Sequence, residues 1–236
     1  QTSQEPESSG ETEELPPQDA NTESADSKQE ESPPGTAVEF DGRRYALIVI
    51  GLAGDPDRQE RMLGTAATLR DWLQRFLSVE RDHITVLSGR ESTETTEPAT
   101  QERIREVAGK LSSELKPKDG LWVFLIGHGS LDSQGGYFHL PGPDLNAQQW
   151  GGIFAEVDAG EQVFWLTHSA SGRFLKPLSA PNRIVITATV EGEVNETRFP
   201  DSLVAILHER FLQPELAEHV DDAGEENVEP QQHNLL

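Results

Sequence analysis

The chain of 236 residues contains no cysteine, and this absence excludes several kinds of chemistry. Disulfide bonds, zinc ribbons, iron–sulfur ligation and thiolate catalysis all depend on cysteine sulfur. Long apolar runs are also missing. The longest candidate, Leu121 to Ile126, is far shorter than the ~20 residues that span a bilayer. The sequence therefore predicts neither a disulfide-stapled protein nor a transmembrane helix.

Basic residues are scarce as well. The chain has 19 Lys and Arg against 42 Asp and Glu, which gives a formal charge of −23. Because a phosphate backbone must be met by a basic surface, we expect no nucleic-acid partner. The acidic residues gather at both ends. Residues 1–38 carry a net charge of −9 and residues 213–236 carry −7, which leaves −7 for residues 39–212.

The composition divides the chain into three parts. Residues 1–38 have Leu15 and Val38 as their only large aliphatic residues and no aromatic residue. Such a segment buries too little apolar surface to offset its ordering entropy, so we predict a disordered acidic linker. Residues 39–212 are predicted to form one folded domain, and 213–236 an acidic C-terminal tail. The chain begins at Gln1, as processing of a precursor would leave it, so we expect an exported protein, periplasmic or extracellular; a cloned fragment is the alternative.

Apolar runs and helical periodicity alternate along residues 39–212. Continuous apolar runs predict strands at 45–50, 83–87, 121–126, 163–166 and 184–189. Apolar residues at spacings of three and four predict helices at 62–76, 104–115, 146–157 and 199–211. This alternation requires a mostly parallel sheet with helices on both faces. The predicted fold class is α/β, a three-layer α/β/α sandwich.

Ligands of open α/β sheets bind beyond the carboxyl ends of the strands, so the segments that follow the strands are candidate sites. Residues 127–130 place His128 between two glycines, directly after the most apolar strand. The glycines allow a sharp turn and leave backbone N–H groups free to face an oxyanion. Residues 167–172 place small and hydroxyl side chains after the next strand. A turn histidine with no catalytic role is the alternative.

Several segments together resemble one family. The segments Leu-Ile-Gly-His-Gly-Ser (125–130), Thr-His-Ser-Ala-Ser-Gly (167–172) and Ile-Val-Ile-Thr-Ala-Thr (184–189) resemble the three blocks of the legumain-like, caspase-fold cysteine peptidases. Residues 51–56, 138–144 and 195–199 resemble segments of a bacterial branch of that group. The resemblance covers about residues 43–212. It implies a caspase–hemoglobinase α/β/α sandwich with peptide or protein partners and no cofactor.

The resemblance also implies site residues, with one departure. His128 matches the family's general base and Gly129 its oxyanion-hole glycine, but the position of the nucleophilic cysteine is occupied by Ser169. Arg58 is the nearest match to an arginine that helps to form an acidic-residue specificity pocket, and Thr189 in the third block is a second candidate for substrate binding. Solvated surface arginines are the plainer interpretation of Arg58 and of two further arginines near the proposed cleft, Arg61 and Arg173.

The function depends on what Ser169 can do at the position of the cysteine, and three functions are considered. A serine hydroxyl is almost wholly protonated and needs a base positioned to take its proton, whereas a cysteine is partly thiolate without help. We therefore expect a catalytically impaired peptidase homologue that acts as a binding or assembly domain. The first alternative is an active serine-type hydrolase of peptides or esters, with a Ser169–His128 dyad and the Gly129 and Ser169 N–H groups as oxyanion donors. The second is a structural scaffold whose cleft is filled, for example by Tyr137 or Phe138.

Two expectations concern the other histidines. Strand alternation points neighbouring side chains to opposite faces, so His168 is expected to face away from Ser169. A metal site made of His128, His139 and His168 is the alternative, but histidines alone at such separations do not define one, and we expect no metal. The sequence leaves the oligomeric state open.

Overall fold

The computed structural model describes residues 40–89, 96–195 and 197–212. The predicted linker 1–38 and tail 213–236 lie outside these residues. Within the described part of the chain, no helix is long and apolar enough to cross a membrane.

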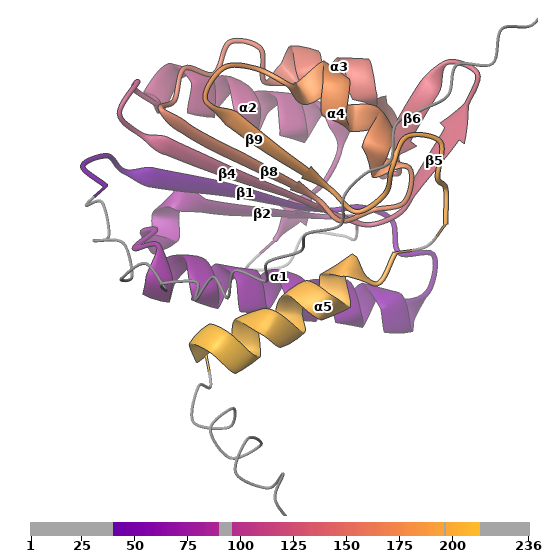
Figure 1. The fold of residues 1–236 in the computed structure, drawn as a ribbon, viewed down its shortest axis with the longest axis horizontal. Helices are drawn as coiled ribbons and strands as arrows, with labels where there is room; N and C mark the ends of the chain where they lie inside the picture. Colours follow the sequence, from indigo (N-terminus) through magenta and orange to yellow (C-terminus); the bar gives the residue numbers. More distant parts are fainter. Residues whose placement is uncertain (1–39, 90–95, 196, 213–236) are drawn as a thin grey trace, which may run out of the picture. The chain divides into compact units, whose positions relative to one another are not determined.

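A six-stranded sheet forms the centre of the domain (Figure 1). Every pairing in it is parallel, as the sequence predicts. In spatial order the strands are β3 (Glu97–Pro98), β2 (Ile84–Ser88), β1 (Arg44–Ile50), β4 (Gly120–Ile126), β8 (Glu161–Leu166) and β9 (Arg183–Thr187). Ile50 at the end of β1 pairs with Ile126 at the end of β4, so the loops that follow both strands leave from one edge.

Helices cover both faces of the sheet. Figure 1 shows α1 (Pro56–Phe76) and α5 (Phe199–Leu207) on one face, and α2 (Gln101–Glu114), α3 (Ala147–Ile153) and α4 (Leu175–Leu178) on the other. Each face has its own apolar core, because alternate residues of β1 point to opposite sides: Leu47 belongs to one cluster and Ile48 to the other. The predicted α/β architecture, with a mostly parallel sheet between helices, is confirmed.

The boundaries of some elements differ from the predictions. Helix α1 begins six residues before its apolar stripe, because Asp55 caps it by accepting a hydrogen bond from the Arg58 N–H and Pro56 occupies the first turn. Helix α3 is shorter than predicted and begins at a capping box of Asn146 and Gln149. The last predicted helix, 199–211, is α5 followed by one π-type turn, His208–Leu212.

A small antiparallel sheet was not predicted from the sequence. It consists of β5 (Gly129–Asp132), β6 (Gly135–Phe138) and β7 (Leu145–Asn146), in that order. These strands are short and rich in glycine and polar residues, so they carry little of the apolar alternation by which strands are recognised. Figure 1 shows β5 and β6 projecting from the end of the main sheet where β4 finishes. Because β5 starts at Gly129, it begins immediately after His128.

Candidate functional site

A pocket of about 400 Å³ opens at the carboxyl edge of the sheet. His128 and Ser169, which follow the neighbouring strands β4 and β8, both line it, as the sequence predicts. Helix α1 and the segment that leads into α5 supply the opposite walls. Among the described residues, the others that line it are Arg58, Arg61, Met62, Thr65, Ile126, Gly127, Thr167, Thr197, Arg198, Pro200 and Asp201.

The Ser169 hydroxyl is engaged by the Gly129 backbone and not by an imidazole. Its Oγ accepts a hydrogen bond from the Gly129 N–H at 3.1 Å and donates one to the Gly129 carbonyl oxygen at 2.9 Å. Ser169 is also 96% buried, since only 4% of its surface is exposed. One of the N–H groups predicted to stabilise an oxyanion is thus used within the protein, and the hydroxyl proton points to a carbonyl.

The His128 imidazole is held by Arg58. Arg58 Nη1 lies 3.0 Å from His128 Nε2. A guanidinium can only donate hydrogen bonds, so Nε2 accepts this one, and the ring carries its proton on Nδ1 in this arrangement. Arg58 is itself paired with Asp55, its Nε lying 3.4 Å from the carboxylate. The predicted substrate-binding arginine therefore lies in the pocket, where one of its contacts is with the predicted base.

The turn that carries Ser169 is fixed by backbone geometry. Ala170 has a left-handed backbone with φ of 59°, a conformation that costs a non-glycine residue about 1–2 kcal/mol. The Thr167 hydroxyl anchors the start of the turn by donating to the Leu125 carbonyl at 3.0 Å. A β-carbon at Gly129 would collide with the Ser169 carbonyl oxygen, so only glycine allows β5 to approach this closely.

His168 points away from the pocket, as strand alternation predicts. Its imidazole is fully buried and lies edge-on to Phe138 and Phe174, with ring centroids 4.9 and 4.8 Å away. Nδ1 donates to the Ser169 carbonyl at 2.7 Å, whereas Nε2 has no partner among the described residues. Burial, only partly offset by this hydrogen bond, lowers the pKa of His168 to about 4. The His168 ring is therefore neutral, and its hydrogen bond to the Ser169 carbonyl stabilises the turn that carries Ser169.

Thr189, the second predicted substrate-binding residue, lies outside this pocket. Its hydroxyl accepts from the Gly172 N–H at 3.1 Å and lies 3.2 Å from the Ser171 hydroxyl. Ser171 Oγ in turn accepts from the N–H groups of Ala188 and Thr189, and β9 ends at Thr187, two residues before the predicted end at residue 189. Thr189 borders a separate hollow of about 650 Å³ beside β9. The structure thus gives it a role in joining the Ser169 turn to β9.

The arginines of the pocket differ from those predicted. Arg61 lines it, as predicted, but Arg173 pairs with Glu191 at 2.6 Å and does not. Arg198, which sequence reasoning did not single out, lines it from the segment just before α5. The rule that ligands gather beyond the carboxyl ends of strands, applied to the segment after β9, is the signal that identifies Arg198.

The three histidines considered for a metal site are each engaged separately. His128 contacts Arg58, His168 is enclosed by aromatic rings, and His139 Nδ1 lies 2.7 Å from the Asp144 carboxylate. In the described ranges, the group of three side chains close enough to share a metal ion is a different one, Glu80, Asp82 and His83, near the amino ends of the strands.

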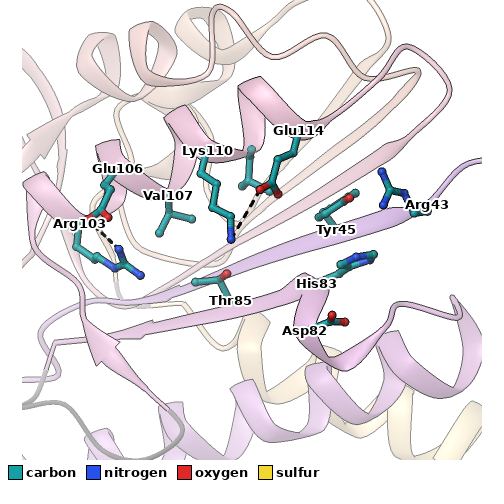
Figure 2. Close-up of a pocket in the computed structure, with 11 residues that line it drawn as sticks. Arg43, Tyr45, Asp82, His83, Thr85, Arg103, Glu106, Val107, Lys110 and Glu114 are labelled. Atoms are coloured by element: carbon teal, nitrogen blue, oxygen red, sulfur yellow. Dashed lines mark ion pairs between the residues drawn. The ribbon is translucent and has the colours of Figure 1, made fainter.

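A second pocket, of about 490 Å³, lies at the amino ends of β1 and β2 (Figure 2). Figure 2 shows Tyr45 and His83 on its floor and the charged side chains of α2 along its rim. Two ion pairs join those side chains to one another, Arg103 with Glu106 and Lys110 with Glu114. The tyrosine and histidine rings stack at 4.2 Å. Because most of its charges are paired within the protein, this pocket offers less to a charged ligand than the one around Ser169.

Comparison with known proteins adds no relative: no protein-family model matches the chain, and no curated protein matches its sequence.

Proposed function

We propose that the domain is a caspase-fold peptidase homologue of the legumain-like group that no longer hydrolyses peptides and acts as a binding domain for a peptide or protein partner. Support comes from the positions of the resembling segments. The blocks around His128 and Ser169 follow adjacent parallel strands, and both residues line one pocket at the edge where such a site is expected.

The proposed loss of peptidase activity is inferred from the hydrogen bonds of Ser169 and His128. In a serine hydrolase the nucleophilic hydroxyl gives its proton to an imidazole that a third group orients. Here Ser169 donates to the Gly129 carbonyl, and His128 Nε2 receives a proton donor, the Arg58 guanidinium. The hydrogen bond from Ser169 to Gly129 and the one from Arg58 to His128 would both have to break before Ser169 could donate its proton to His128 Nε2. Among the described contacts, no carboxylate is bonded to His128 to orient its imidazole. Loss of the nucleophile's function costs a hydrolase on the order of 10⁶ in turnover.

The scaffold with a filled cleft is less well supported. Neither Tyr137 nor Phe138 lines the pocket; the Phe138 ring is fully buried and packs against Trp150 and His168. The walls formed by α1 and the segment before α5 leave about 400 Å³ of space beside Ser169. A pocket that persists after loss of the nucleophile's role supports binding of a partner rather than a purely architectural role.

Fluorophosphonate labelling tests the proposal, because these probes react with activated serine hydroxyls. We expect no labelling of the native chain above that of Ser169→Ala. Stoichiometric labelling that Ser169→Ala abolishes would establish the serine-type hydrolase instead.

The substitution Ser169→Cys tests the kinship. Because a thiol is intrinsically nucleophilic and partly ionised, we expect this variant to hydrolyse some members of a broad peptide library slowly. The matched control is Ser169→Cys combined with His128→Ala, which should lose that activity. A well-folded Ser169→Cys variant that cleaves no peptide would show that more than the nucleophile has been lost from the site.

A further inference from the structure

We propose that the pocket at the amino ends of β1 and β2, drawn in Figure 2, binds a short peptide of two or three residues that is free at both ends. In this site Arg43 and Tyr45 bind the carboxylate of the peptide, and Glu80 and Asp82 bind its ammonium group. The pocket lies at the opposite edge of the sheet from Ser169, so the inference goes beyond the proposed function and is independent of it.

The sheet face beneath α2 changes from apolar to polar where the pocket lies. Tyr45 and Leu47 of β1 both belong to the apolar cluster on this face, as do Val107 and Leu111 of α2. Next to Leu47 in the strand register stands Thr85 of β2, and the residues that line the pocket beyond it are mostly polar or charged. The cavity there measures about 490 Å³, within the range of roughly 300–1,000 Å³ that small-molecule sites occupy.

The Tyr45 hydroxyl is a buried group that lacks a partner within the protein. Only 5% of the surface of Tyr45 is exposed, yet its hydroxyl forms no hydrogen bond with any described residue. A buried tyrosine hydroxyl usually has a hydrogen-bond partner, and a molecule in the pocket that Tyr45 lines can supply one. Burial raises the pKa of the Tyr45 hydroxyl, so it stays protonated and can donate to a carboxylate.

Arg43 adds a positive charge beside this hydroxyl. Its guanidinium carbon lies 5.7 Å from the centre of the Tyr45 ring, and the guanidinium forms no ion pair or hydrogen bond with any described residue. A guanidinium presents a planar set of N–H donors that matches a carboxylate. Figure 2 shows Arg43 next to Tyr45. The two side chains therefore form an anion-binding end of the pocket.

Two carboxylates form a cation-binding end. Oxygen atoms of Glu80 and Asp82 and a nitrogen of His83 lie within 4.8 Å of one another. The 3₁₀ turn Arg81–His83 brings them together, because side chains three positions apart eclipse in such a turn, as Glu80 and His83 do at 3.8 Å. Asp82 forms no ion pair with any described residue, so its carboxylate is available to an ammonium group.

The separation of the two ends favours a peptide over a single amino acid. The stacked rings of Tyr45 and His83, with centres 4.2 Å apart, lie between Arg43 and Asp82 in Figure 2. The two charges of one amino acid are attached to the same carbon and do not span this pair, whereas an extended peptide gains ~3.3 Å with each residue. Three basic and three acidic side chains line the pocket, which suits a ligand without net charge.

Titration of the full chain with the tripeptide Ala-Leu-Ala tests the inference. Binding is measured by calorimetry, with EDTA present to keep metal ions from the carboxylates. The N-acetylated and C-terminally amidated forms of the same peptide each lack one charge. The first test variant, Tyr45→Phe, removes only the hydroxyl and has Tyr137→Phe as its matched control. The second, Arg43→Gln, has Arg81→Gln as its control, an exposed arginine nearby that does not line the pocket.

We expect the native chain and both controls to bind the free tripeptide with equal affinity. Tyr45→Phe and Arg43→Gln should each bind it about tenfold more weakly, because each loses a hydrogen bond to a charged group. Asp82→Asn should weaken binding of the free tripeptide about tenfold and leave that of the N-acetylated form unchanged, since the N-acetylated form has no ammonium group. Circular dichroism and urea unfolding establish that each variant is folded.

Three results would overturn the inference. Equal affinity for the free and N-acetylated tripeptides would reduce the site to a carboxylate site without a cation-binding end. Native affinity in a folded Tyr45→Phe variant would show that the buried hydroxyl does not contact the ligand. No binding of the tripeptide by the native chain would exclude the peptide as occupant. None of these results bears on the proposed function, which concerns the other edge of the sheet.

Discussion

Acidification should destabilise this domain through His168, whose imidazole is buried between Phe138 and Phe174. Its pKa is about 4 in the folded protein and about 6.5 in an unfolded chain. The unfolded state therefore takes up the proton first, and stability is lost as the pH falls from 6.5 to 4. A difference of about 2.5 units corresponds to roughly 3 kcal/mol in total, of which about 2 kcal/mol is lost between pH 7 and pH 5.

The measurement is urea unfolding at pH 7 and pH 5, where most exposed carboxylates stay ionised. His168→Asn is the test variant, because an amide keeps an N–H donor near the position of Nδ1 but does not titrate. The native chain should lose about 2 kcal/mol more than this variant between the two pH values.

The control is His208→Gln, which removes an exposed histidine at the end of α5 and is measured in the same way. Equal losses for the native chain and His168→Asn would refute the reasoning, because His168 would then titrate alike in the folded and unfolded states.

Two further predictions concern backbone contacts that hold the site and the sheet. Gly129→Ala should lower the unfolding free energy by several kcal/mol in urea titrations, because the new methyl group meets the Ser169 carbonyl; full stability would contradict the close approach of β5. Asp119 accepts hydrogen bonds from the N–H groups of Arg43 and Lys116. Burial raises the pKa of the Asp119 carboxyl, but these two hydrogen bonds outweigh burial and lower it. The stabilising effect of the Asp119 carboxylate is therefore lost as the pH falls through the acid range. We expect Asp119→Ala to cost about 2–4 kcal/mol at pH 7 and Asp119→Asn less, by thermal or urea unfolding; equal costs would argue against the paired acceptor role.

The main sheet and the location of the pocket were predictable from the sequence. Runs such as Tyr45 to Ile50 and Leu121 to Ile126 are apolar without alternation, which occurs when helices cover both faces of a strand. A parallel sheet then fixes which end of each strand meets the others, so His128 and Ser169 had to leave from the same edge. That their strands are also neighbours is an observation of the structure.

Only the tertiary structure decided how these residues are used. Whether Ser169 bonds to His128 or to the Gly129 backbone depends on the path of β5, a short glycine-rich strand without an apolar pattern. The partner of His128, Arg58, and the third arginine of the pocket, Arg198, lie 70 residues away on either side of it. Periodicity and local propensity determine which segments become strands and helices. Hydrogen bonds between segments so distant in the chain depend on packing geometry, which local sequence patterns do not predict.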